Sequence, residues 1–164
     1  MNIQGVVFLN GIMLGTTATV LFDLWLLSQK LMGRRVLNFA LLGRWIGHFK
    51  QLKFVHKRIA EAPIVPLELI IGLIAHYVIG IGIAVLLLLA VHEGWLLKPD
   101  IFAALSVGAC TVVFPLLIMQ PGMGGGLAFT NTASPFKNCL NSLFNHMVFG
   151  LCLYLAAMLM RMFH

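Results

Sequence analysis

The sequence predicts an all-α, polytopic membrane protein with four transmembrane helices and a basic interfacial segment in the first loop. Of its 164 residues, 60% are hydrophobic and only 10% are charged, whereas an average soluble domain has roughly 25% charged residues. A soluble chain of this size could not bury so much apolar surface, so lipid must cover it. The length predicts one domain, and we expect residues 1–164 to form a single transmembrane domain.

Four apolar stretches approach the roughly 20 residues that a membrane-spanning helix needs. They are expected at residues 5–29, 67–91, 101–120 and 140–160. The first is longer than the apolar core of a signal peptide and no Lys or Arg precedes it, so it is interpreted as a retained helix. Pro63 and Pro66 break the chain before the second helix, and Asp100 can cap the third.

The first loop, residues 30–66, is the most basic part of the chain. Eight of the eleven Lys and Arg residues lie between Lys30 and Arg58, a stretch without Asp or Glu. Within it, the segment Val36–Phe54 mixes basic with apolar residues, which is typical of a segment lying in the membrane interface. We therefore expect an anionic lipid surface, and no nucleic acid, as its partner. The candidate headgroup contacts are Arg44, Trp45, His48 and His56.

Basic residues also predict the orientation of the chain. The first and third loops together carry nine Lys and Arg, while both termini and the second loop carry only Lys98 and Arg161. Because basic loops stay in the cytoplasm, both termini are expected outside, which in a Gram-negative bacterium means the periplasm.

The two halves of the chain resemble each other. The run TVLFDL at 19–24 aligns with TVVFPL at 111–116, and HYVIG at 76–80 aligns with HMVFG at 146–150. The order is the same in both halves, which predicts a parallel repeat of two helices plus two.

Polar residues inside the apolar stretches share faces with small residues, where helices approach closely. Asp23, His76 and His146 each lie on the order of 10–14 Å along a helix from the nearest charge at the same membrane side. We expect them to converge as a buried cluster, with Thr19 and Thr111 nearby. Such a cluster can hold a proton or ion, a metal ion, or haem b between two histidines, or it can serve only helix packing.

A glycine-rich stretch follows the third helix. Gln120, Gly122, Gly124 and Gly125 are a candidate loop for a ligand or an anion, because glycines can expose backbone amides. The alternative is a tight, buried turn. No catalytic motif is found, and the stretch lacks the Lys-Ser/Thr ending of a phosphate-binding loop.

Several runs resemble the DUF2938 family of bacterial inner-membrane proteins, whose function is unknown. They are GRWIGH at 43–48, His56, AHYVIG at 75–80, MQPGMG at 119–124 and HMVFG at 146–150. The resemblance covers nearly the whole chain and implies a bacterial cytoplasmic membrane, but it implies no activity. It places these residues within shared motifs: Trp45, His48, His56, His76, Gln120, Pro121, Gly122 and His146.

Three classes of function remain open from the sequence. The first, which we favour, is an ion- or proton-coupled transport module that uses the buried Asp/His cluster. The second is a metal- or haem-binding redox subunit of the membrane. The third is an accessory or assembly protein, without catalytic activity, that packs against a copy of itself or a larger membrane partner.

Overall fold

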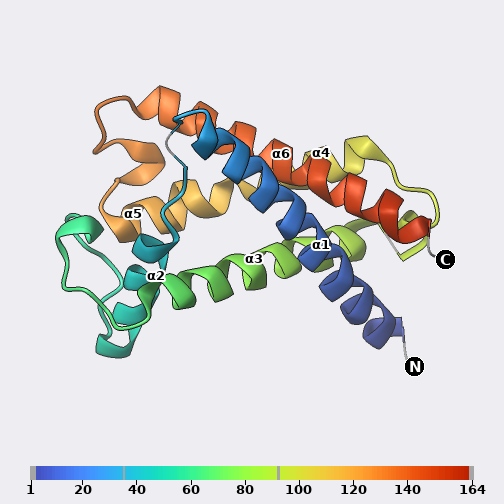
Figure 1. The fold of residues 1–164 in the computed structure, drawn as a ribbon, viewed down its shortest axis with the longest axis horizontal. Coiled ribbons are helices and arrows are strands. Elements are labelled where there is room, and N and C mark those ends of the chain that lie inside the picture. Colours follow the sequence, from blue (N-terminus) through green and yellow to red (C-terminus); the bar gives the residue numbers. More distant parts are fainter. Residues whose placement is uncertain (1–2, 35, 92, 163–164) are drawn as a thin grey trace. The chain divides into compact units, whose positions relative to one another are not determined.

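The computed structural model describes residues 3–34, 36–91 and 93–162, and every regular element in these ranges is helical. Four helical segments are long and apolar enough to cross a membrane: Gly5–Leu31, Glu68–Val91, Ile101–Met123 and Pro135–Arg161 (Figure 1). The predicted all-α fold with four membrane helices is therefore confirmed. The arrangement as a repeat of two plus two helices stays a prediction. Arg35, counted with the basic residues of the first loop, lies outside the described residues.

The first two membrane helices lie close to their predicted bounds. Helix α1 spans Ile3–Leu31 and helix α3 spans Glu68–Val91. Leu67, the predicted start of the second helix, has a φ of 60° and lies outside α3. A left-handed residue cannot begin an α-helix, which explains this small difference.

The third membrane segment is not one regular helix. It consists of α4 (Ile101–Thr111), the π-helical turn η4 (Pro115–Met119) and the short helix α5 (Gln120–Met123). Pro115 has no backbone N–H and so interrupts the regular hydrogen-bond pattern. The chain continues through a wider turn, in which the amide of Gln120 donates to the carbonyl of Pro115.

The last helix, α6, spans Pro135–Arg161 and begins five residues before its predicted start at 140. Hydropathy marks only the part of a helix that lipid would cover, whereas Pro135 is well suited to the first helical position. The polar first turns, with Lys137 and Asn138, are therefore helical although they are not apolar. A short helical turn, η5 (Leu127–Phe129), precedes α6.

The first loop is largely ordered into helical pieces. They are α2 (Phe39–Gly47), η1 (His48–Gln51) and η2 (Ile59–Glu61). The Asn38 side chain caps α2 by accepting a hydrogen bond from the amide of Ala40 at 3.0 Å. The second loop contains the turn η3 (Glu93–Leu96).

The chain forms two compact units. Unit 1 comprises the described residues of 1–36, 77–111 and 145–164, and unit 2 comprises those of 37–76 and 112–144. In unit 1, α1 packs closely on α3, because a Cβ at Gly15 would collide with the backbone of Ile81. In unit 2, α2 packs on the start of α3, because a Cβ at Gly43 would collide with the carbonyl oxygen of Glu68.

Candidate functional site

The carboxylate of Asp23 is held by a second membrane helix within unit 1. The hydroxyl of Tyr77 in α3 donates a hydrogen bond to Asp23 Oδ2 at 2.9 Å. Asp23 lies eight residues before the end of α1, on the order of 12 Å along the helix. A carboxylate at this depth is costly in lipid, so a hydrogen-bonded partner reduces that cost.

His146 has its own partner within unit 1. Its Nδ1 lies 3.0 Å from the hydroxyl oxygen of Thr111, and that hydroxyl donates to the carbonyl of Gly108 at 2.8 Å. Because the single hydroxyl proton is used on Gly108, Nδ1 of His146 must be the donor to Thr111. In the neutral ring this assignment leaves Nε2 as the nitrogen with an available lone pair.

Thr19 is fully buried in unit 1 and serves packing between helices. Its hydroxyl donates to the carbonyl of Gly15 in its own helix at 2.7 Å. Its side chain lies against Gly80 of α3, where any Cβ would collide with the Thr19 hydroxyl. The predicted close approach of small-residue faces is confirmed for these two helices.

His76 lies in unit 2, where its ring packs on Phe39 with ring centroids 4.6 Å apart. Asp23 and His146 belong to unit 1, so convergence of the three predicted residues stays a prediction. In the part of the chain that the structure describes, no group of three or more His, Cys, Asp or Glu residues is arranged to hold a metal ion.

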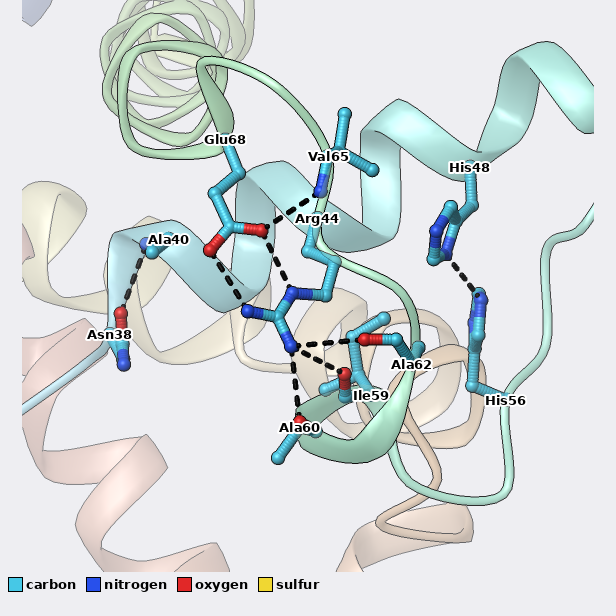
Figure 2. A network of polar contacts seen from close by, with 10 residues as sticks. All are labelled: Asn38, Ala40, Arg44, His48, His56, Ile59, Ala60, Ala62, Val65 and Glu68. Atoms are coloured by element: carbon cyan, nitrogen blue, oxygen red, sulfur yellow. Dashed lines mark hydrogen bonds and ion pairs between the residues drawn. The ribbon is translucent and has the colours of Figure 1, made fainter.

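A buried clamp in unit 2 joins the first loop to α3 (Figure 2). Arg44 forms a two-pronged ion pair with Glu68, with Nε–Oε2 at 2.8 Å and Nη2–Oε1 at 2.9 Å. Its third nitrogen, Nη1, faces the carbonyl oxygens of Ile59, Ala60 and Ala62 at 3.0–3.5 Å. The hydrogen bond to Glu68 raises the pKa of Arg44 above its ordinary value, although burial acts in the opposite direction.

Two buried histidines lie beside this clamp (Figure 2). His48 Nδ1 lies 2.8 Å from His56 Nε2, and His56 Nδ1 lies 3.3 Å from the carbonyl oxygen of Gly122. A carbonyl can only accept, so His56 must carry its proton on Nδ1 and accept from His48 through Nε2. The neutral pair therefore forms a directed chain from His48 through His56 to Gly122.

Burial lowers the pKa of His56 below its ordinary value. Electrostatic interaction with His48 and Lys53 lowers the pKa of His56 further, whereas the hydrogen bond to Gly122 acts in the opposite direction. A second proton on His56 would also remove the lone pair that accepts from His48. The fold thus favours neutral His56.

The residues predicted to contact lipid headgroups point into the protein instead. Arg44, His48 and His56 are only 9%, 3% and 5% exposed, and their polar atoms contact the protein. Trp45 is partly buried, and its Nε1 donates to the carbonyl of Phe54 at 2.7 Å. The mixture of basic and apolar residues predicted an interfacial segment. It could not show that Glu68 and backbone carbonyls accept the hydrogen bonds that lipid headgroups were expected to accept.

The glycine-rich stretch adopts a tight turn. The amide of Gly125 donates to the carbonyl of Gln120 at 2.7 Å, and that of Gly124 donates to Pro121 at 3.2 Å. Gly124 has a φ of 97°, which only glycine adopts readily. Gly122 packs on the Trp45 ring, where any Cβ would collide. Two amides that the anion-loop hypothesis requires are thus already used within the turn.

Two hydrogen-bond partners of the candidate residues, Tyr77 and Glu68, were not predicted from the sequence. Tyr77 follows His76 directly, and only the helical rotation of about 100° per residue shows that the two face different directions. Glu68 closely follows the basic first loop in the sequence, and an acid next to a basic loop is a signal for an ion pair. The sequence does not show which of the eight Lys and Arg residues of the first loop pairs with Glu68.

Comparisons with known proteins give one match. The family described as "Protein of unknown function (DUF2938)" matches residues 12–160, nearly the whole chain. Neither the curated proteins nor the solved structures contain a match to the chain. With four helices that are long and apolar enough to cross a membrane and a match over almost the full length, the chain belongs to the DUF2938 family.

Proposed function

We propose that the chain is a small ion- or proton-coupled transport module of a bacterial cytoplasmic membrane. The observation that carries this proposal is the Asp23–Tyr77 hydrogen bond between two membrane helices. An ionisable residue within a membrane segment is costly, and such residues characteristically mark the paths of protons and ions.

The chemistry of the pair suits reversible protonation. When Asp23 is ionised, the Tyr77 hydroxyl donates to it, as observed. When Asp23 takes up a proton, its charge disappears and its new O–H can itself donate. The contact between α1 and α3 therefore differs in the two states, which links protonation to the packing of two helices.

His146 supplies a second protonatable group in the same unit. Its Nδ1 is engaged with Thr111, so its Nε2 is the atom at which a proton would be gained or lost. In this proposal Asp23 is the primary proton-binding group, and His146 is a further member of the path.

Proton movement can be measured in vesicles that carry the purified protein. An imposed potassium diffusion potential should drive proton uptake above that of empty vesicles, read by an internal pH-sensitive dye. Asp23→Asn should reduce this uptake at least about tenfold, because the amide binds no proton. Tyr77→Phe should give an intermediate rate.

Asp100→Asn is the matched control. Asp100 is exposed and caps α4 by accepting from the amide of Ala103 at 2.9 Å, a role that Asn can also fill. Unchanged uptake in Asp23→Asn, or uptake no faster than in empty vesicles, would reject the proposal. Metal analysis and an absorption spectrum of the purified protein test the redox-subunit alternative, which requires bound metal or haem.

A further inference from the structure

The first loop exposes a segment that is both basic and apolar. We define the loop tip as residues Lys50–Arg58, which run from the last two residues of η1 to the residue before η2. Three large apolar side chains of the loop tip are strongly exposed: Leu52 at 80%, Phe54 at 51% and Val55 at 68%. Exposed side chains of this size, three within four residues, are typical of a surface that contacts a partner or a membrane.

Cations surround these apolar residues. Their side chains are exposed, and they belong to Lys50, Lys53, Lys57 and Arg58. Arg58 pairs with Glu61 at 2.8 Å, and Glu68 is engaged with Arg44. The three lysines therefore carry charge that neither of these acids neutralises.

The backbone of the loop tip is held in place by the buried residues beside it. The carbonyl of Phe54 accepts from Trp45 Nε1 at 2.7 Å, and the amide of His56 donates to the carbonyl of Gly122 at 2.9 Å. Leu52 adopts a left-handed φ of 56°, a conformation that a residue with a Cβ rarely adopts. The apolar side chains are thus presented on a fixed backbone rather than on a random coil.

The loop tip also lies beside the end of a membrane helix within unit 2. Helix α2, which leads into the loop tip, packs on the first turns of α3, where Gly43 meets Glu68 and Gly72 meets Phe39. Because α3 is long and apolar enough to cross a membrane from Glu68, we expect the chain that follows α2, including the loop tip, near the level of the lipid headgroups.

We propose that the loop tip is a docking surface for an anionic lipid bilayer. Leu52, Phe54 and Val55 enter the boundary of the acyl chains, while Lys50, Lys53 and Lys57 contact anionic headgroups. Charge decides between occupants: a second loop tip would carry the same positive charge and would be repelled, whereas an anionic surface attracts it. This role moves the headgroup contacts from the buried Arg44, His48 and His56 to exposed lysines.

Photo-crosslinking of the full chain in vesicles tests this proposal. Phe54→p-benzoylphenylalanine is reconstituted into phosphatidylcholine alone and into mixtures with phosphatidylglycerol, then irradiated and analysed by intact-mass spectrometry. We expect lipid adducts in which phosphatidylglycerol is enriched about fivefold or more over its share in the vesicle. Adding the combined change of Lys50, Lys53 and Lys57 to Gln should remove the enrichment.

Two controls make the result specific. Leu24→p-benzoylphenylalanine, at a side chain that is 59% exposed on α1, should give adducts in proportion to the lipid mixture. Changing Lys98, Lys137 and Arg161 to Gln removes the same charge elsewhere and should leave the enrichment at Phe54 intact. Crosslinked dimers, the absence of lipid adducts at Phe54, or enrichment that survives loss of the three lysines would each overturn the proposal.

Discussion

At the scale of single residues, the guanidinium of Arg44 is the most heavily used polar group in unit 2. It contacts one carboxylate and three carbonyl oxygens from η2 and the chain that follows. Because these acceptors lie 15–24 residues from Arg44 along the chain, Arg44 fixes the path of the first loop against α3. Its geometry requires the planar, forked guanidinium and not merely a positive charge.

Removing Arg44 should therefore be costly. Arg44→Ala is expected to lower the free energy of unfolding by about 2–3 kcal/mol, because Glu68 and the carbonyls lose their donor. Arg44→Lys should rescue only part of this loss. The measurement is thermal unfolding in mild detergent. Arg58→Ala, which breaks the exposed pair with Glu61, is the control and should leave the melting temperature unchanged; an equal effect of both variants would contradict the clamp.

His56 should make stability depend on pH. Its pKa in the folded chain is lowered, so between its folded and unfolded pKa values the unfolded chain binds more protons. The stability contributed by neutral His56 is thus fully present above its unfolded pKa, about 6.5, and is lost as pH falls toward the folded value. Melting temperatures measured from neutral to mildly acidic pH should fall more steeply in the wild type than in His56→Gln. Parallel curves would refute this assignment.

At the scale of elements, glycines decide how closely the helices approach. Gly15 of α1 lies against the backbone of Ile81, whereas Gly82 of α3 has open space where a Cβ would be. Both are helical glycines, and Gly82 directly follows Ile81 in α3, yet only Gly15 is at a contact between helices. Spacing along the sequence cannot distinguish them, because both belong to apolar helices rich in small residues.

The two glycines offer a matched test. Gly15→Ala should lower the melting temperature in detergent, because separating two packed helices typically costs about 1–3 kcal/mol. Gly82→Ala should leave it unchanged or raise it slightly, since alanine is the better helix former. If both variants behave alike, the close approach of α1 and α3 is not what Gly15 provides.

At the scale of the whole molecule, the distribution of charge carries the prediction of orientation. The first and third loops together carry nine Lys and Arg, whereas the termini and the second loop carry two. We propose that the nine lie in the cytoplasm and both termini outside. A periplasm-active reporter fused after His164 should be active, and a reporter that fluoresces only in the cytoplasm should stay dark. The opposite pattern would reverse the proposed topology.

The internal repeat also belongs to this scale and stays a prediction. If the two halves are related, Thr19 should overlie Thr111 and His76 should overlie His146. Within unit 1 the two threonines have different neighbours, since Thr19 lies against Gly80 and Thr111 against His146. Superposition of the halves in an experimental structure, without a shift of a helical turn, is the test.

Composition and periodicity alone determined that this is a four-helix membrane protein with a basic first loop. These properties follow from how long each apolar run is and where charges interrupt it, which are local features of the chain. The bounds of α1 and α3 were accordingly predicted within two residues. The π-turn after Pro115 required the hydrogen-bond pattern of the folded chain, because a proline in an apolar run can be accommodated in several ways.

The partners of the polar residues were decided only by the tertiary structure. Asp23 was identified from the sequence as an acid inside an apolar helix, but its bond to Tyr77 depends on how α1 and α3 rotate against each other. Arg44, His48 and His56 were expected at the lipid surface because their local segment is basic. They are buried because distant residues supply their acceptors. Glu68 lies 24 residues from Arg44 along the chain, and Gly122, whose carbonyl faces His56, lies 66 residues from it. No local pattern in the sequence reveals these acceptors. A hydrogen bond needs two groups within about 3 Å, and only the fold brings distant segments that close.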